Sequence, residues 1–340
     1  MTAPETSRPV VPASVRAARV HAFGGPEQLR VEEIDTPRPG PGEVLVRVAF
    51  AGLNPLDYKQ RDGSSPSARA LTLPAALGRE LAGTVLDAGE GVDLDALGLS
   101  PGTTVYGVRP MTDPRGCYAE AVVIAAGDLA PVPAGPDGAV PTGEALAPYG
   151  GLALAGTTAL TAVRQAHLAP GETVLVHGGS GGVGQLLLPL LVQAGAGRIW
   201  ATGKAENAVR IAELGATPIP YDEADWQEVI REATGGSGVD VVIDTHYFST
   251  FEPSLEHLAP GGRIVVLPTL ADLTPATERG IEAHIPRIEP TREDLDALAA
   301  DHARGTLPLE VSEILPLADV ARGHEQLQSG HTRGKIVLAL

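Results

Sequence analysis

The sequence predicts an α/β protein with two domains, a β-rich domain and a doubly wound parallel sheet covered by helices. Residues 15–138 contain short apolar, β-branched segments separated by glycine and proline turns, which indicates an all-β, barrel-like domain. From about residue 141 onward, helical segments alternate with apolar strand segments, which favours a parallel sheet with helices on both faces. In this second part, a glycine cluster at residues 178–184 lies between a strand and a helix.

The composition narrows the class of protein. The chain has 340 residues, enough for two domains, and its net charge of −17 argues against nucleic acid or an anionic membrane as a partner. The single cysteine, Cys117, excludes a disulfide framework and a cysteine-rich zinc site. No apolar run approaches the ~18–20 residues that a membrane helix needs. Residues 1–14 lack the apolar core of a signal peptide, so we expect a flexible N-terminal tail and a cytoplasmic protein.

Strands are expected in the first part at residues 17–23, 29–33, 43–51, 81–88, 103–107 and 118–124. Residues 52–63, between two of these strands, predict a loop that runs into a short helix. In the second part we expect strands at 172–177, 198–202, 217–221, 239–244 and 262–267, and helices at 154–168, 183–194, 205–214, 225–234 and 251–258.

The last seventy residues are less regular. Residues 270–290 lose the periodicity and contain three prolines, after which Thr291 is suited to cap a helix. A strand near 313–315, a helix at 317–328 and a strand at 335–340 are expected to finish the chain. Arg263–Leu267 is expected near an edge of the sheet, where it is able to pair with a copy of itself in a homodimer.

The glycine cluster carries the most specific motif. Gly179, Gly181 and Gly184 spell G-x-G-x-x-G, directly after a strand and at the start of a helix that leads to a second strand. Glycine keeps such a turn tight and lets the backbone approach a pyrophosphate, which the helix N-terminus then holds. The sequence therefore predicts a dinucleotide site whose contacts come from Gly179, Ser180, Gly181, Gly182, Val183 and Gly184.

Two other interpretations of the cluster remain open. Gly178-x-Ser180-x-Gly182 also spells G-x-S-x-G, the nucleophile elbow of serine hydrolases, with Asp244 and His257 following in the right order for a triad. The cluster can also be a packing turn without a ligand. A dinucleotide site explains Gly184 and the following strand, which an elbow does not, and a mere packing turn gains nothing for the entropy that five glycines cost.

The end of the second strand indicates which dinucleotide is bound. A site for NAD usually has an acidic residue there, whereas this strand ends Ala201-Thr202-Gly203-Lys204. A cation in place of a carboxylate favours a 2′-phosphate, and hence NADPH. The alternative is that Lys204 is only solvated at a helix N-terminus, where its charge opposes the helix dipole. The chain has only three lysines, Lys59, Lys204 and Lys335.

Taken together, the segments GLNPLDYKQRDG, LGRELAGTV, PGTTVYG, GETVLVHGGSGGVGQ, LAPGGRIV and HTRGKIVL resemble the medium-chain dehydrogenase/reductase superfamily, in its zinc-free quinone oxidoreductase (zeta-crystallin-like) branch. The resemblance runs from about residue 15 to 340. It implies a GroES-like catalytic domain of residues 15–140 and 290–340, a Rossmann domain of residues 141–289 that binds NADP, and NADPH held in a cleft between them.

The resemblance also implies chemistry without a metal. Zinc-dependent relatives use a cysteine and a histidine at places where this chain has Asn54-Pro55 and Gly78-Arg79-Glu80, and arginine does not ligate zinc. The implied reaction is hydride delivery from NADPH to a small-molecule quinone or to the C=C bond of an enone. Lysine rather than tyrosine at position 59 favours double-bond reduction slightly.

Family members place the N-P-x-D-x-K stretch near the nicotinamide, which implies roles for Asn54, Tyr58 and Lys59. Lys59 is the first candidate for a proton donor to the developing oxyanion and Tyr58 is the second. Alternatives are packing under the loop for Tyr58 and a contact to the cofactor ribose for Lys59. The remaining implied cofactor contacts are Thr158, Thr202, Tyr221, Thr245, Arg333 and Lys335.

Two departures from the family pattern stand out. Asn207 takes the place of a frequent lysine, which Lys204 is expected to replace. His246-Tyr247-Phe248 follows Asp244-Thr245 where relatives usually have Val-Gly-Gly. Bulk there narrows the nicotinamide pocket, although we expect Phe248 to pack in the core. The functional alternatives are a catalytically silent NADPH-binding protein and a tailoring enoyl reductase of secondary metabolism.

Overall fold

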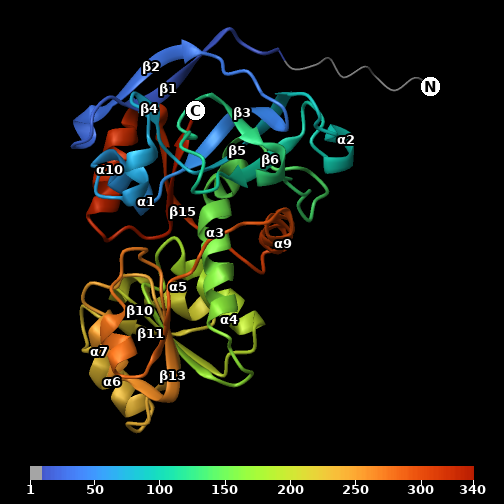
Figure 1. Cartoon of the computed structure of the whole chain (residues 1–340). Helices are drawn as coiled ribbons and strands as arrows, with labels where there is room; N and C mark the ends of the chain where they lie inside the picture. The colour runs from blue at the N-terminus through green and yellow to red at the C-terminus, as the bar shows by residue number, and fades with distance from the viewer. Residues whose placement is uncertain (1–9) are drawn as a thin grey trace. The chain divides into compact units, whose positions relative to one another are not determined.

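The computed structural model describes residues 10–340, so residues 1–9 of the predicted tail lie outside it. Contacts divide the chain into two compact units (Figure 1). The β-rich unit consists of residues up to Leu154 with Glu289–Gly305 and Val311–Leu340, and the parallel-sheet unit consists of Ala155–Ile288 with Thr306–Glu310. The first division lies inside helix α3 (Ala147–Gln165), whereas the sequence places it between 140 and 141.

The β-rich unit is built on antiparallel pairing around β3 (Glu43–Gly52), which pairs with β5, β7 and β16. Its strands are β1 (Ser14–Val20), β2 (Leu29–Asp35), β4 (Ala75–Ala76), β5 (Glu80–Ala88), β6 (Thr104–Val108), β7 (Ala121–Ala125), β8 (Leu129–Pro131), β15 (Val311–Pro316) and β16 (Lys335–Ala339). Its helices are α1 (Pro55–Arg61), α2 (Leu94–Leu97), α9 (Arg292–Ala303) and α10 (Val320–Gln328).

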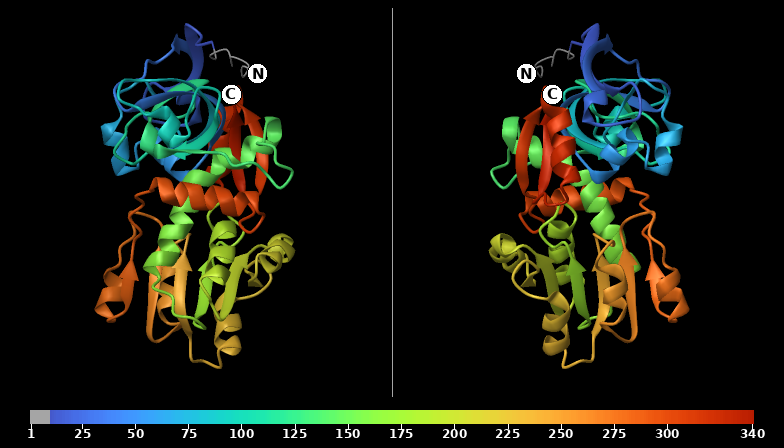
Figure 2. Two further views of the ribbon diagram at one scale, coloured as in Figure 1. Left: turned by 90° about the vertical axis from the view of Figure 1, so that its right-hand side faces the viewer. Right: turned by 90° about the vertical axis from the view of Figure 1, so that its left-hand side faces the viewer.

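Alternating apolar residues of these strands form the core of the β-rich unit. Val44, Val46 and Val48 of β3 are buried on one face and pack with Val85 of β5 and Ile336 of β16. The last strand of the chain therefore completes the sheet that the first hundred residues begin, as the red and blue segments of Figure 2 show. This pairing explains why the C-terminal segment belongs to the β-rich unit.

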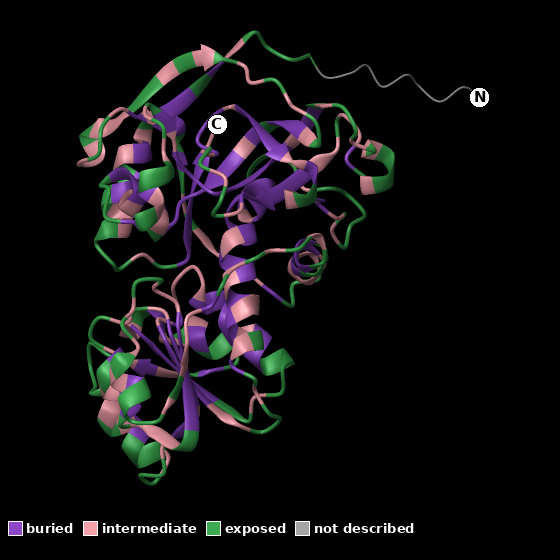
Figure 3. Cartoon of the chain, viewed as in Figure 1, coloured by how far each residue is buried: buried purple, intermediate pink, exposed green. Residues whose placement is uncertain are grey.

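The parallel-sheet unit has six strands in the order β11-β10-β9-β12-β13-β14, and every pair is parallel. The strands are β9 (Thr173–His177), β10 (Arg198–Gly203), β11 (Thr217–Pro220), β12 (Val239–Asp244), β13 (Leu258–Val266) and β14 (Glu282–His284). The helices are α4 (Gly184–Gln193), α5 (Ala208–Glu213), α6 (Trp226–Ala233), α7 (Phe251–Leu255) and α8 (Thr274–Glu278). The central strands are buried, with helices around them (Figure 3).

This strand order confirms the predicted doubly wound sheet. Counted in chain order from β9, the strands lie as 3-2-1-4-5-6, the order of a dinucleotide-binding fold. The order reverses between β9 and β12, which are neighbours in the sheet. In open sheets of this kind, ligands bind outside the carboxyl ends of the strands at that switch point.

One edge of the sheet corrects the sequence prediction. Residues 270–290, which show no periodicity, contain α8 and the short strand β14. β14 pairs with β13 from Arg263 to Val265, so both sides of this part of β13 are occupied. Arg263–Leu267 therefore lies near an edge, as expected, next to the edge strand β14. Because β14 occupies that side of Arg263–Val265, the suggested direct pairing of this segment with a copy of itself is wrong.

Helix α3 contains the glycine pair Gly150-Gly151, and its contacts within the β-rich unit explain both glycines. A Cβ on Gly150 would lie 2.6 Å from the Cβ of Phe50, and one on Gly151 would lie 3.0 Å from Cε of Lys335. The helix can therefore pack closely on β3 and β16. Residues 143–165 are long and apolar enough to cross a membrane by composition, yet 72% of the apolar window is buried within the protein, as in a core helix.

Candidate active site

The glycine turn follows β9 at the switch point, and its glycines are required by close packing. A Cβ on Gly184 would lie 2.0 Å from the carbonyl oxygen of Gly178, and one on Gly179 would lie 2.7 Å from Cβ of Ala201. Gly178 has a φ of +81°. The turn passes directly into α4. The N–H groups of Gln185, Leu186 and Leu187 donate to carbonyl oxygens of the turn, whereas within residues 10–340 no hydrogen bond engages those of Gly182, Val183 and Gly184, which are therefore suited to an anion.

Two threonines, from the ends of the strands on either side of β9, fix this turn. The hydroxyl of Thr202 accepts a hydrogen bond from the N–H of Gly178 at 3.1 Å, and its carbonyl accepts one from the N–H of Gly179 at 2.8 Å. Thr245 donates its hydroxyl to the carbonyl of His177 at 2.8 Å. Both predicted cofactor residues therefore shape the turn from the ends of β10 and β12.

His177 is the last residue of β9 and precedes the glycine turn. No role was assigned to it from the sequence. It is buried, with Nε2 2.9 Å from the hydroxyl of Ser254 and its ring 4.6 Å from that of Trp226. Burial lowers the pKa of His177 to about 4, so the imidazole is neutral at physiological pH. The neutral His177 ring therefore contributes no electrostatic attraction to a phosphate bound at the turn.

The end of β10 brings the residues expected near the 2′-phosphate together. Lys204 follows β10, and the N–H of Tyr221 donates to the carbonyl of Gly203 at 3.1 Å. Tyr221 is 46% exposed. Asn207 is buried, and its Oδ1 has no hydrogen-bond partner among the described residues. The sequence reasoning missed Asp222, whose carboxylate accepts from the N–H of Ala205 at 2.8 Å and places a negative charge beside this cluster.

The remaining predicted cofactor residues belong to different units. Thr158 is partly buried on α3 within the parallel-sheet unit. Arg333 is exposed and precedes β16 in the β-rich unit. Lys335 begins β16 and is only 4% exposed.

Helix α1 presents the predicted catalytic residues within the β-rich unit. Asn54 is its N-cap and Pro55 its first residue, and a capping box joins Asn54 to Asp57. Tyr58 and Lys59 follow on the helix and are both partly buried. The Lys59 ammonium lies 6.0 Å from the centre of the Tyr58 ring. Within residues 10–340, no hydrogen bond or ion pair engages that ammonium, which leaves its protons available to a substrate.

Beneath α1 lies a buried network centred on Glu80 and Lys335. The Lys335 ammonium donates to Oε1 of Glu80 at 2.8 Å, to Oδ1 of Asn54 at 2.7 Å and to the carbonyl of Leu53 at 2.9 Å. Oε1 of Glu80 also accepts from Nδ2 of Asn54 at 2.9 Å, and Oε2 accepts from the N–H of Leu154 at 2.8 Å. Every proton of the lysine is used, and so are both oxygens of the glutamate.

This network fixes what Asn54 can do. The Asn54 side chain is bonded to Lys335, to Glu80 and to the backbone of α1, and the residue is 7% exposed. These contacts suit an amide that positions the start of α1. The sequence reasoning gave no role to Glu80, although a glutamate that opens an apolar strand is a signal that it could have used.

Asp57 extends the network to Tyr118. One carboxylate oxygen accepts from the Tyr118 hydroxyl at 2.6 Å and from the N–H of Asn54 at 2.8 Å, while the other has no partner among the described residues. Burial raises the pKa of Asp57 to about 6, against the opposing effects of the Tyr118 hydroxyl, the Asn54 N–H and the charges of Lys335 and Arg79. Ionised Asp57 is therefore costly to bury.

This pKa predicts a pH dependence of stability. Below about pH 4 the carboxyl is protonated in the folded and unfolded states, whereas between about pH 4 and 6 only the folded state keeps the proton. The wild type should thus lose about 3 kcal/mol of unfolding free energy relative to Asp57→Asn as the pH rises through this window. Urea unfolding of both proteins at pH 4 to 7 measures the difference. A constant difference would show that Asp57 ionises normally.

Arg79 occupies the place of a zinc-ligating histidine, and its contacts show what it does there. It is buried, and its guanidinium donates to the carbonyl oxygens of Asp113 at 2.6 Å and Pro110 at 2.7 Å. It thereby anchors the loop that precedes Tyr118. In the part of the chain that the structure describes, no group of three His, Cys, Asp or Glu residues is arranged to hold a metal ion.

The hydrolase interpretation does not fit the geometry. The Asp244 carboxylate accepts from the N–H groups of His246 and Tyr247, both at 2.8 Å, and from the Thr250 hydroxyl at 2.7 Å. The carbonyl of His257 pairs with the first residue of β12, so His257 lies at the amino end of the sheet. Ser180 follows β9 at the carboxyl end, and within residues 10–340 no hydrogen bond joins Ser180 to His257 or His257 to Asp244, so no triad forms.

Phe248 corrects another expectation. It is 77% exposed, so it does not pack in the core as predicted. Tyr247 packs inward instead, with its ring 5.2 Å from that of Phe251.

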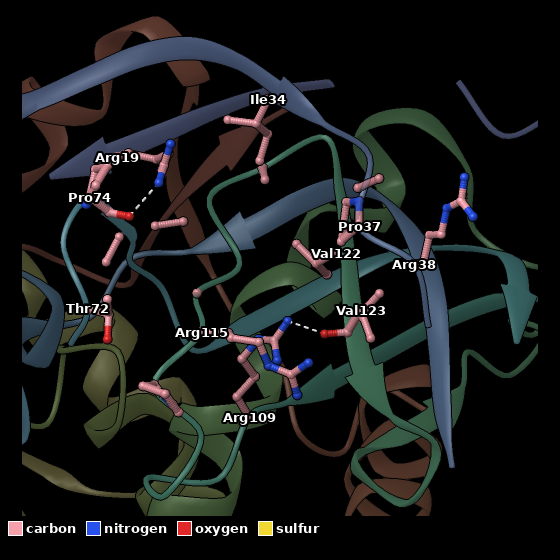
Figure 4. A pocket seen from close by; sticks show the side chains of 16 residues that line it. Arg19, Ile34, Pro37, Arg38, Thr72, Pro74, Arg109, Arg115, Val122 and Val123 are labelled. Carbon is pink, nitrogen blue, oxygen red and sulfur yellow. Dashed lines mark hydrogen bonds between the residues drawn. The ribbon is translucent and has the colours of Figure 1, made fainter. Parts of the chain in front are cut away.

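A cavity of about 410 Å³ lies elsewhere in the β-rich unit, and no predicted site residue lines it. Figure 4 shows Arg109 and Arg115 side by side on its wall, with Arg19 across from them. Each of these arginines is paired with a carboxylate: Arg19 with Glu32, Arg109 with Asp113, and Arg115 with Asp113 and Glu43. The charges of these three arginines are neutralised within the protein, whereas Arg38, which also lines the cavity, has no ion pair within residues 10–340.

Comparison with known families matches both units. A family model described as an alcohol dehydrogenase GroES-like domain matches residues 40–134, and one described as a zinc-binding dehydrogenase matches residues 214–338. A 2-haloacrylate reductase from Burkholderia is 31% identical over 341 residues, covering 95% of this chain and 98% of the relative.

Solved structures give the same picture. A quinone oxidoreductase from Coxiella burnetii is 30% identical, with a TM-score of 0.86 and coverage of 96% of this chain and 99% of that one. The Escherichia coli quinone oxidoreductase, solved in complex with NADPH, is 28% identical, with a TM-score of 0.81 and coverage of 96% and 100%. These relatives are similar to the chain along nearly its whole length.

Proposed function

Because this chain belongs to the zinc-free quinone oxidoreductase (zeta-crystallin-like) branch of the medium-chain dehydrogenase/reductase superfamily, we propose that it uses NADPH to reduce a quinone or the C=C bond of an α,β-unsaturated carbonyl. The glycine turn at the switch point between β9 and β12 is the observation that carries this proposal. A Cβ on Gly184 would collide with the turn itself, and Thr202 and Thr245 hold the turn in shape. The residues present therefore fit a dinucleotide pyrophosphate.

NADPH, when bound, supplies a hydride to the electrophilic carbon of the acceptor, which places two electrons in a new C–H bond. The π electrons of the acceptor then move to its carbonyl oxygen, which becomes an enolate or a phenolate. We assign to Lys59 the donation of a proton to that oxygen, after which its amine is reprotonated from water. One such donor lowers the activation free energy of the reaction by ~3 kcal/mol. The Lys59 ammonium makes no hydrogen bond or ion pair within residues 10–340, which supports this role.

Residues around the start of α1 position Lys59. Asn54 and Lys335 are committed to the buried network with Glu80, so we assign them the fixing of α1 rather than contact with the reacting atoms. Tyr58 is the second candidate donor. Burial and the charge of Asp62 raise the pKa of its phenol, which makes it a weaker proton donor.

The cofactor preference rests on Lys204, with Tyr221 and Asn207 beside it. Lys204→Glu replaces attraction for a 2′-phosphate by repulsion, so the ratio of kcat/KM for NADPH to that for NADH should fall at least tenfold. Steady-state kinetics with both cofactors measure the ratio, and the exposed Arg231→Glu on α6 is a charge-matched control. An unchanged ratio would remove Lys204 from the cofactor site.

The reductase proposal is tested by NADPH consumption with a benzoquinone, an ortho-quinone, a linear enal, a cyclic enone and no acceptor. Turnover of at least one acceptor is expected. Turnover of enals and enones alone would assign double-bond reduction, and turnover of quinones alone would assign quinone reduction. Tight NADPH binding without turnover of any acceptor would contradict the proposal and favour a silent NADPH-binding protein. A tailoring enoyl reductase of secondary metabolism would perform the same chemistry on a larger enone.

We also propose a cytoplasmic homodimer. β14 is the last strand on its side of the sheet and pairs only with β13 among the described residues, which leaves its other side able to pair with a second chain. Sedimentation velocity tests this, and a 35.0 kDa species alone would contradict it.

A further inference from the structure

The carboxyl end of β12 carries three consecutive aromatic side chains that the reaction described above does not use. His246 and Phe248 are exposed, Phe248 to 77%, and their rings lie 5.9 Å apart in an edge-to-face arrangement. The chain has only four phenylalanines, and 4% of its residues are Phe, Trp or Tyr. An exposed aromatic pair is therefore unusual for this sequence, and its place in the fold is informative.

The pair stands at the ligand-binding edge of the parallel sheet. β12 borders the switch point, and Thr245, which precedes His246, bonds to His177 at the start of the glycine turn. Oγ1 of Thr245 would lie only 2.4 Å from a Cβ on Gly178. The aromatic segment thus begins one residue away from the wall of the proposed cofactor site.

Hydrogen bonds hold the backbone of the segment at His246 and Tyr247, although that backbone is strained. Tyr247 has a φ of +77°, a conformation that costs a non-glycine residue of order 1 kcal/mol or more. Asp244 holds it by accepting from the N–H groups of His246 and Tyr247, and the Tyr247 hydroxyl accepts from the N–H of Asp272 at 2.9 Å. The strain turns Tyr247 inward and leaves its two neighbours outside.

The exposed Phe248 ring offers a flat apolar face, and the His246 imidazole, inclined at 77° to it, offers a hydrogen-bonding edge beside that face. We propose that Phe248 and His246 form a stacking face that makes the enzyme select flat, ring-bearing acceptors, such as quinones and aryl-substituted enones, over small linear enals. This inference rests on the proposed reductase function and specifies its substrate class. A linear enal has no ring to stack and gains little from the pair.

The test compares wild type, Phe248→Ala and Phe248→Leu with two classes of acceptor. Phe248→Ala should lower kcat/KM about tenfold for 1,4-naphthoquinone and 4-phenyl-3-buten-2-one, and leave it within about twofold for trans-2-pentenal. Phe248→Leu keeps apolar bulk without a flat face, so it should resemble Phe248→Ala. Phe23→Ala, at another exposed phenylalanine in the β-rich unit, is the matched control and should change neither class.

Three results would overturn the stacking face. They are an equal loss for both classes, no loss for either, and a higher KM for NADPH in Phe248→Ala, which would assign Phe248 to the cofactor. A lack of turnover by the wild type would instead contradict the proposed function.

A binding measurement, which needs no turnover, distinguishes failure of the stacking face from failure of the proposed reductase function. With NADP⁺ present, the wild type should bind 2-naphthol, which it has no means to reduce, about tenfold more tightly than Phe248→Ala in a calorimetric titration. Equal affinities would overturn the stacking face whether or not the protein is a reductase.

Discussion

Replacement of Lys335 by methionine is expected to destabilise the protein by about 3–5 kcal/mol, because it leaves the Glu80 carboxylate buried without its cation. Glu80 is fully buried and Lys335 is 4% exposed, so water is not available to replace the lost partner. Asn54 also loses its bond to the ammonium, so the start of α1 should become more mobile. Urea unfolding at pH 7 measures the change in stability.

Two control variants distinguish the loss of the buried ion pair from nonspecific destabilisation by the substitution. Lys335→Met combined with Glu80→Gln removes both charges and should recover a large part of the lost stability. Arg322→Met breaks the exposed pair with Glu313, whose side chains are 49% and 31% exposed, and should cost no more than about 1 kcal/mol. If Lys335→Met lost as little as Arg322→Met, the network would not support the fold.

Replacement of Lys59 by methionine is expected to lower kcat about a hundredfold, because the developing oxyanion loses its proton donor. The KM for NADPH should change less than about threefold. Tyr58→Phe is the matched variant, since it removes the hydroxyl of the neighbouring candidate, and it should keep most of the activity. Steady-state kinetics with an acceptor found by the NADPH assay measure both variants.

The opposite pattern would reassign Lys59. If kcat were kept and the KM for NADPH rose at least tenfold, Lys59 would be a contact to the cofactor ribose. If Tyr58→Phe lost a hundredfold while Lys59→Met did not, the phenol would be the donor.

The fold could be predicted where the chain repeats a regular local pattern. β9, β10 and β12 lie within a residue of their predicted limits, because buried parallel strands have continuous apolar sequences between clear turns. β14 and α8 were missed, since strands and helices of three to five residues are too short to show a period. The position of β14 depends on pairing with β13, which is a tertiary contact.

In the candidate site, too, local features could be predicted from the sequence and long-range contacts could not. The glycine turn is local, so its motif appears in the sequence. The network of Asn54, Glu80 and Lys335 joins residues that are 281 and 255 positions apart, and no local pattern reports such contacts. Phe248 was expected inside because it is apolar, yet the strained backbone at Tyr247 places it outside. The exposure of Phe248 thus depends on the backbone conformation of one residue, Tyr247.

The most direct test of metal-independent hydride transfer uses a deuterium label on the transferred hydride. The chelator-treated enzyme should be given NADPH deuterated at the transferred C4 position, together with 2-cyclohexenone or whichever enone the NADPH assay finds to be turned over. Direct hydride transfer without a metal predicts one deuterium on the β-carbon of the saturated ketone, at a rate that chelation does not change. A product without deuterium, or activity that disappears with the metal and returns with zinc, would contradict it.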